Sequence, residues 1–297
     1  MKITRLDYYD KFKCIADRCT DSCCIGWEID IDPETLAIYQ KEEGELGEKL
    51  KMNIHNGSFI LTEDERCPFL QTDGLCELIC RKGDGFLCEI CREHPRYYEY
   101  CDDHIDMGVG LCCEEACRLL FSEKHPLELI TEGEGKLDED TLELLTLRAE
   151  LIKKVQDASN SLDELFFSLD KNIFQFWDAF EPYDDRWSIT TEHIKECFDR
   201  LVAKQAEFDA YMKKRSCEYR HLAVYLLHRY FMRSQYCAPS VILRGISLYM
   251  KTQYLWDLYV YHTTGKFDSA DRIDTAKYIS KQIEYSEENI DMLFYGA

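Results

Sequence analysis

The second half of the chain has apolar residues at helical spacing, in one segment after another. Ser161 and Glu164 occupy the two positions of a capping box, which marks the start of a short helix there. The pattern predicts helices over 137–157, 161–169, 190–214, 218–236, 239–264 and 269–286. No strand and helix alternation and no glycine-rich nucleotide loop interrupts this series, so we predict an α-helical bundle-like domain over residues 137–297.

Residues 1 to about 125 lack this periodicity and carry several turn sequences rich in glycine, aspartate and proline. Asp32 as N-cap and Pro33 at the first helical position predict a helix that runs to about Leu50. A short strand is predicted over 58–64 and a short helix over 114–121.

These patterns together predict a mainly α fold. A loop-rich, cysteine-cluster metal-binding region at residues 1–130 packs on the helical domain, and a glycine-containing, charged linker at 131–136 joins them.

Composition narrows the class of protein. The chain has 297 residues, 45% of them hydrophobic, which is enough for a substantial core. The N-terminal residues have no apolar run of the kind that a signal peptide needs, and no segment approaches the roughly 20 apolar residues of a membrane helix. We therefore expect a cytoplasmic protein with no membrane partner.

The net charge of −21 argues against nucleic acid as a partner, because a phosphate backbone requires a basic surface. Two interpretations of the acidic surface stay open. It is either an ordinary solvated surface or a means of attracting a basic, lysine-bearing protein.

Cysteine is the most unusual component of the sequence. Of 16 cysteines, 13 lie between Cys14 and Cys117. In a long chain without an export sequence, clustered thiols indicate metal binding rather than disulfides. The other three, Cys197, Cys217 and Cys237, lie in helical patterns and are expected to be small buried apolar residues.

The spacing of the thiols favours a metal cluster over a single zinc ion. Thiolates suit zinc, copper(I) and iron–sulfur clusters. A zinc ribbon needs two CxxC pairs, and this sequence has one, Cys88 and Cys91. The adjacent Cys23 and Cys24 point in divergent directions from an extended backbone, which a cluster accommodates more readily than one small ion.

Several separated motifs then resemble one family. They are Cys14, Cys19, the Asp21-x-Cys23-Cys24 step, Trp27, CPFL at 67–70, GLC at 74–76, CREHPR at 91–96 and the Cys113-Glu-Glu-Ala run. In this order they resemble the CxxCxxCC family of zinc- or iron-chelating proteins, and within it the chain is most similar to the flagellin lysine-N-methylases.

The resemblance implies a bacterial cytoplasmic protein-lysine N-methyltransferase that acts on flagellin. S-adenosylmethionine would be the methyl donor, and an iron–sulfur cluster, 4Fe–4S rather than zinc, the bound metal. The thiols that match the family pattern are Cys14, Cys19, Cys23, Cys24, Cys67, Cys76, Cys91 and Cys113.

The chain also departs from the family pattern. It has additional thiols at Cys80, Cys88, Cys112 and Cys117, and Glu114 stands where proline is usual. A neighbour such as Cys88 or Cys112 could therefore replace a family ligand, and the ligand set stays open.

No motif identifies the catalytic base or the methyl-donor pocket. Arg96 and Tyr97 are candidates for binding the carboxylate and adenine ring of the donor, the alternative being an ion pair and core packing. His221, Tyr225 and His228 share one helix face, which indicates either interior packing or, less often, a substrate pocket.

Two further function classes stay open. One is a non-catalytic zinc- or iron-chelating structural or interaction module. The other is an electron-transfer protein, which fits less well because it gives the large helical domain no role.

Overall fold

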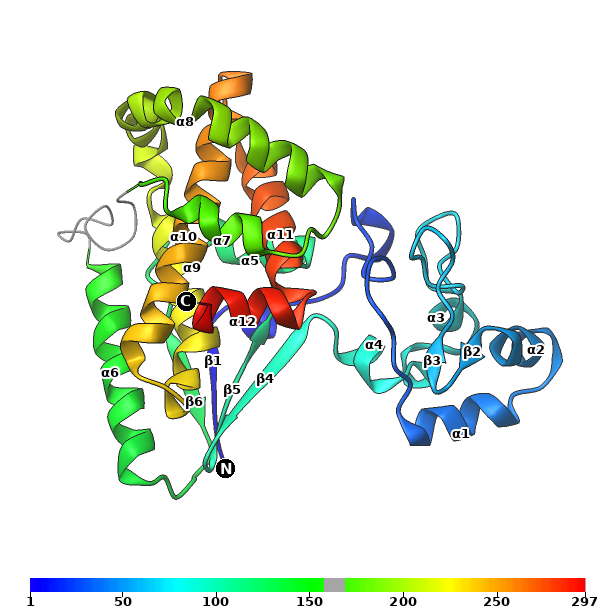
Figure 1. Ribbon diagram of the computed structural model, residues 1–297. Helices are drawn as coiled ribbons and strands as arrows, with labels where there is room; N and C mark the ends of the chain where they lie inside the picture. The colour runs from blue at the N-terminus through cyan, green and yellow to red at the C-terminus, as the bar shows by residue number, and fades with distance from the viewer. Residues whose placement is uncertain (158–168, 297) are drawn as a thin grey trace. The chain divides into compact units, whose positions relative to one another are not determined.

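A computed structural model describes residues 1–157 and 169–296 of the chain, which divides into two compact units (Figure 1). Residues 13–97 form the cysteine-rich unit, and residues 1–12 with 98–297 form the helical unit. The mainly α fold class is confirmed. No helix in the described parts of the chain is both long and apolar enough to span a bilayer.

The division of the chain differs from the predicted boundary between residues 130 and 137. The reason is a sheet in the helical unit, which combines the first residues of the chain with segments near residues 100 and 130. Strand β1 (Lys2–Leu6) pairs in parallel with β5 (His104–Val109) and antiparallel with β6 (Leu129–Glu132), and β4 (Arg96–Cys101) completes the order β4-β5-β1-β6. Residues after about 98 therefore fold with the helices, although they belong to the cysteine-rich half of the sequence.

The long helices of the second half form as the apolar periodicity predicts. Helix α10 is central, because it packs against α7, α8, α9, α11 and α12. The helices of this unit are α5 (Glu114–Ser122), α6 (Glu139–Gln156), α7 (Ile173–Ala179), α8 (Asp185–Met212), α9 (Cys217–Tyr230), α10 (Pro239–Thr264), α11 (Ser269–Glu284) and α12 (Glu287–Tyr295). The helix predicted over 161–169 lies almost wholly outside the described residues.

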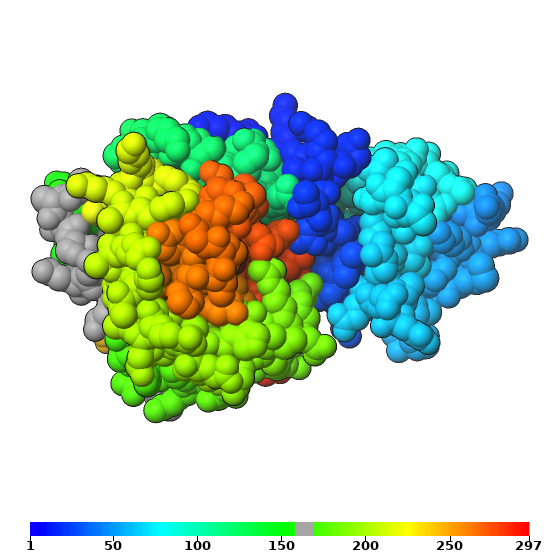
Figure 2. Space-filling view, turned by 90° about the horizontal axis from the view of Figure 1, so that it is seen from above, coloured from blue at the N-terminus to red at the C-terminus, as the bar shows by residue number. Residues whose placement is uncertain are grey.

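Aromatic side chains fill much of the space around α10. Trp256 of α10 stacks on Trp187 of α8 with ring centroids 5.2 Å apart, and both side chains are buried. The end of α10 and the start of α11 reach the surface beside α8 (Figure 2). There the Tyr211 hydroxyl accepts a hydrogen bond from the backbone N–H of Phe267 at 3.2 Å.

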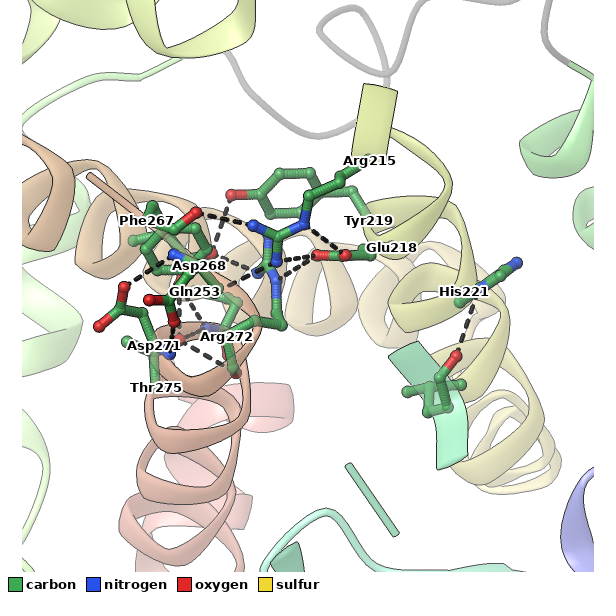
Figure 3. A network of polar contacts seen from close by, with 12 residues as sticks. Arg215, Glu218, Tyr219, His221, Gln253, Phe267, Asp268, Asp271, Arg272 and Thr275 are labelled. Atoms are coloured by element: carbon green, nitrogen blue, oxygen red, sulfur yellow. Dashed lines mark hydrogen bonds and ion pairs between the residues drawn. The ribbon is translucent and has the colours of Figure 1, made fainter. Parts of the chain in front are cut away.

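A network of buried charges joins α9, α10 and α11 (Figure 3). Arg272 of α11 is fully buried, and its guanidinium donates to Glu218 of α9 at 3.0 Å and to Asp257 of α10. The Tyr219 hydroxyl also donates to Asp257 at 2.8 Å. Burial raises the pKa of Asp257, and the positive charge of Arg272 and the hydroxyls of Thr275 and Tyr219 partly oppose this rise.

The cysteine-rich unit has a smaller apolar core and little regular structure. Its elements are α1 (Pro33–Lys41), α2 (Gly44–Met52), β2 (Ile54–His55), β3 (Ser58–Phe59), α3 (Glu77–Lys82) and α4 (Glu89–Glu93). The single helix predicted from Pro33 to about Leu50 is wrong, because the chain turns between α1 and α2. Gly44 has a φ of +71° there, and a Cβ at Gly47 would clash with the Glu42 carbonyl. The strand predicted over 58–64 is only two residues long.

We predict that Arg272→Met lowers the free energy of unfolding of the helical unit by about 3–5 kcal/mol, because Asp257 and Glu218 would be left buried without their cation. Urea denaturation followed by tryptophan fluorescence measures this. Lys204→Met is the matched control, since Lys204 pairs with Glu207 at the surface, and it should lower the free energy of unfolding far less. Equal losses in the two variants would contradict the prediction.

Candidate functional site

Five thiols of the cysteine-rich unit pack around its single apolar core. Cys67 and Cys88 are buried members of this core, beside Phe69 and Leu87. Three more thiols, half-buried, pack against it. The thiol cluster, as we call this set, consists of Cys24, Cys67, Cys76, Cys88 and Cys91.

Backbone pairing brings the first two members together from distant parts of the sequence. The Cys67 N–H donates to the Cys24 carbonyl at 2.8 Å, next to a bridge between Ile25 and Arg66. The motif around Cys24 therefore lies beside the CPFL motif that begins at Cys67, as a metal site shared by the two motifs would require.

The other three members lie at or near the starts of two short helices. Cys76 is the N-cap residue of α3, and Cys88 is the N-cap residue of α4, which also carries Cys91. Asp32 fixes this arrangement, because its carboxylate caps α1 through the Thr35 N–H at 2.9 Å and accepts from the Glu89 N–H at 2.8 Å. These two hydrogen bonds, led by the one from Glu89, lower the pKa of Asp32.

The thiols influence one another and are shielded from water. Burial raises the pKa of Cys67 to about 11, against the backbone N–H groups of Phe69 and Leu70, which favour the thiolate. A hydrogen bond between Cys88 and Cys91 lowers the pKa of Cys88 and raises that of Cys91. The neighbouring Cys24 and Cys67 raise the pKa of Cys91 further. Burial also raises the pKa of Cys76, so Cys67, Cys76 and Cys91 favour the protonated thiol, and a bound metal would displace these protons.

The donor chemistry of the cluster fits a soft metal, because every member is a thiol. The side chains are gathered without being assembled into a coordination site. In residues 1–157 and 169–296, no group of three or more histidine, cysteine or acidic side chains is arranged to hold a metal ion.

Of the eight thiols that the family pattern indicates, the structure gathers four in this cluster: Cys24, Cys67, Cys76 and Cys91. Cys14 is exposed and accepts from the Ala16 N–H at 3.4 Å, while Cys19 ends the short 3-10 helix Ala16–Arg18. Cys113 belongs to the helical unit, where it is the N-cap residue of α5.

The adjacent cysteines have different surroundings, as expected of side chains that diverge from the backbone. Cys24 packs against the apolar core, whereas Cys23 is exposed. Burial raises the pKa of Cys76, and the nearby Cys23 thiolate raises it further. The Cys23 carbonyl accepts from the Trp27 indole N–H at 2.9 Å, and the Trp27 ring stacks on His94 at 5.3 Å. The spare thiol Cys88, a possible replacement for a family ligand, lies in the cluster.

The candidate residues outside the thiol motifs lie on strand β4 and helix α9. Arg96 and Tyr97 are the first residues of β4, at the end of the cysteine-rich unit, and their role in binding the methyl donor stays a prediction. His221, Tyr225 and His228 are buried within the helical unit. Their polar atoms bond mainly to backbone groups, His221 to the carbonyls of Leu120 and His125, so this face packs in the interior.

A buried charged group was missed by the sequence reasoning. Asp106 of β5 accepts from His104 at 2.9 Å and pairs with Arg148 of α6, and its Oδ1 lies 3.7 Å from His228 Nδ1. Burial opposes ionisation, yet Arg148 and the two histidines hold the pKa of Asp106 well below its usual range. No sequence motif marks these residues, because they meet only when α6 and α9 cover the sheet.

Comparison with known proteins finds flagellar and lysine-N-methylase relatives. The chain is similar to the flagellar biosynthetic protein FliU of Salmonella muenchen, with 25% identity over 144 residues, which cover 45% of this chain and 83% of FliU. It is also similar to the lysine-N-methylases of Salmonella typhimurium and Salmonella choleraesuis, each with 24% identity over 137 residues. The resemblance to the lysine-N-methylases is thereby confirmed.

The matches to the lysine-N-methylases cover only part of each protein. The matched residues cover 43% of this chain but only 34% of each lysine-N-methylase, so the chain spans about a third of the length of those proteins. No family profile matches the chain, and no solved structure matches it.

We predict that iodoacetamide labels the thiols of the metal-free protein at different rates at pH 7.5. Exposed Cys80 should react at least about tenfold faster than Cys67, whose pKa of about 11 leaves little thiolate, and than Cys112, whose pKa burial raises to about 12. Mass spectrometry of tryptic peptides over time measures the rates. Equal rates at Cys80 and Cys67 would show that the cluster is open to solvent.

We predict that His221 contributes to acid destabilisation. Burial lowers the pKa of His221, so its contribution to stability is complete above the unfolded value near 6.5 and is lost as pH falls below it. His221→Gln should lose less free energy of unfolding between pH 7.5 and pH 5 than the wild type, by about 1.4 kcal/mol for each unit of pKa depression.

Urea titrations at both pH values measure this difference. His193→Gln replaces an exposed histidine of the same unit and is the control. A His221→Gln variant with the pH dependence of the wild type would contradict the assignment.

Proposed function

We propose that the chain is an iron–sulfur protein-lysine N-methyltransferase that transfers the methyl group of S-adenosylmethionine to lysine ε-amino groups of flagellin. The similarity to two proteins named lysine-N-methylase carries this proposal. The similarity to a flagellar biosynthetic protein supports a flagellar substrate. Because the matches cover a third of the lysine-N-methylases, the activity of the whole enzyme is proposed for this chain and not transferred to it.

The thiol cluster supports the metal part of the proposal. Its five members lie around one core, and a cubane takes four protein thiolates or three with an open position. An iron–sulfur cluster at these thiols would supply covalent links between the loops of a unit whose apolar core is small and, with one iron open, a place for the amino and carboxylate groups of the methyl donor. Cys14, Cys19, Cys23 and Cys113 stay candidates from the family pattern.

The reaction places a simple demand on the protein. The lone pair of a deprotonated lysine Nε attacks the sulfonium methyl carbon, the carbon–sulfur bond breaks, and S-adenosylhomocysteine leaves with the electron pair. The proton of the amine must pass to a nearby base or to water. The protein must therefore hold a lysine that carries a positive charge in solution and release its proton before the methyl group moves.

The alternative is a structural or interaction module in which zinc or iron holds the cysteine-rich unit together. It would use the same thiol cluster and would need neither a methyl donor nor a protein substrate. Metal identity and methylation distinguish the two proposals.

We expect the full chain, purified without air, to be brown with broad absorption near about 400 nm, as thiolate-bound iron clusters are. It should methylate flagellin when S-adenosylmethionine is added, as measured by peptide mass spectrometry. Cys67→Ser should lose most of the iron, and its methylation rate should fall roughly tenfold or more, because Cys67 is the most buried thiol of the CPFL and GLC motifs.

Cys197→Ser is the matched control. Cys197 is buried to the same degree as Cys67, but it lies on α8 of the helical unit and should keep both iron and activity. Colourless protein with stoichiometric zinc and no methylation would overturn the enzyme proposal in favour of the structural module.

A further inference from the structure

Four members of the thiol cluster fall into two pairs, and a turn of the backbone creates the first pair. The chain folds back on itself between Cys67 and Cys76. The Leu70 N–H donates to the Cys67 carbonyl at 3.0 Å, and Leu70 then forms a bridge with Cys76. The Glu77 N–H donates to the Phe69 carbonyl at 2.8 Å, which closes the turn. Thiols from the CPFL and GLC motifs are thereby held as neighbours.

The start of a helix creates the second pair. Cys88 is the N-cap residue of α4, and Cys91 lies in the first turn of this helix. Their side chains share a hydrogen bond, so the two sulfurs are in contact. Cys88 is completely buried, whereas Cys91 is half-buried. Two thiols in contact, with two residues between them in the sequence, have the arrangement of a metal-chelating pair.

Hydrogen bonds to the region of α1 anchor the backbone on both sides of Cys88. The Tyr39 hydroxyl donates to the Phe86 carbonyl at 2.9 Å, two residues before this thiol. The Asp32 carboxylate accepts from the Glu89 N–H at 2.8 Å, directly after it. A ligand held in this way needs little further ordering when it binds.

The two pairs lie against one apolar core. Cys67 and Cys88, one from each pair, are buried members of that core, and the other two thiols pack against it. Cys67 lies near enough to Cys88 and to Cys91 for the charges of these thiols to influence one another. The two-pair site, as we call this set, consists of Cys67, Cys76, Cys88 and Cys91.

Cys24, the fifth member of the thiol cluster, is connected differently. It packs against the same core, but its hydrogen bond to the first pair runs through the backbone, since its carbonyl accepts from the Cys67 N–H at 2.8 Å. Its sequence neighbour Cys23 is exposed and diverges from it. These two adjacent thiols therefore do not form a third pair.

The number of thiols in the two-pair site matches what a soft metal needs. A zinc ion in a closed structural site and a four-iron cluster each take four protein thiolates. The alternative is that Cys88 is only a small apolar residue of the core. Its direct contact with a second thiol argues against this interpretation.

We propose that the two-pair site binds one metal centre through all four thiolates, so that Cys88 is a ligand and Cys24 is not. Cys88 lies outside the family pattern, which gives it no role. In the described residues the side chains do not yet surround an ion, so binding would turn them inward. The inference rests on the metal part of the proposed function and requires no methylation. With four thiolates bound, no coordination position is left for the methyl donor, and the centre would link the loops of the cysteine-rich unit.

The test uses the full chain, freed of metal without air and titrated with Co(II) alone. Thiolate-bound Co(II) has a sulfur-to-metal charge-transfer absorption whose intensity follows the number of thiolates. We expect four thiolates on the first equivalent bound by the wild type. Cys88→Ala should lower this absorption by about a quarter and weaken Co(II) binding roughly tenfold or more, because one of four ligands is lost. Cys24→Ala should change neither.

Cys117→Ala is the matched control. Cys117 is also completely buried and outside the family pattern, but it lies on α5 of the helical unit, so this variant should bind Co(II) as the wild type does.

A second variant keeps the test decisive if Cys88→Ala does not fold. It replaces by alanine the other five thiols of the cysteine-rich unit, none of which is buried: Cys14, Cys19, Cys23, Cys24 and Cys80. The two-pair site is then the whole set of thiols in that unit, and the four-thiolate absorption should be retained.

The failure of this inference can be told apart from that of the proposed function. Unchanged absorption in Cys88→Ala, or loss of the four-thiolate absorption in the five-fold variant or in Cys24→Ala, overturns the inference alone. Wild-type protein that binds no Co(II) through thiolates contradicts both the inference and the metal part of the proposed function. The expected absorption changes, in a protein that does not methylate flagellin, support the inference and count against the enzyme proposal only.

Discussion

The helical unit depends on one buried guanidinium. Arg272 lies between α9, α10 and α11, and its charge is tolerated at full burial only because Glu218 and Asp257 are buried beside it. A shift of any one of these helices along its axis would separate a buried charge from its partner. Since α10 packs against α7, α8, α9, α11 and α12, these two ion pairs fix the position of the helix on which most of the unit packs.

The cysteine-rich unit obeys a different constraint. Its core contains few large apolar side chains for a segment of this length, and thiols occupy places that leucine or isoleucine would fill elsewhere. Burial keeps such thiols protonated, as at Cys67, until a metal competes for them. A metal bound at these thiols would therefore stabilise this unit directly, whereas the helical unit is held by its own packing. This contrast explains why one chain contains both a tightly packed half and a loop-rich half.

The sequence predicts the long helices well, but not the sheet or the assembly of the thiols. Helices α6, α8, α10 and α11 follow the apolar period closely, because amphipathic packing and capping residues such as Asp138 and Asp268 act over a few residues. The sheet was missed, since its strands are short and its partners are far apart, with β1 pairing across a hundred residues to β5. Spacing located the thiol motifs, but only the fold places Cys24 beside Cys67 and assigns Cys113 to the other unit. The Asp106 and Arg148 pair has no local pattern at all, because it exists only in the packed protein.

The acidity of the chain has an ordinary structural role at many positions. A net charge of −21 by itself is consistent with a solvated surface or with a basic partner. Many carboxylates fit the first interpretation, because they cap helices or pair with cations, as Glu77 does with Lys49 at 2.5 Å.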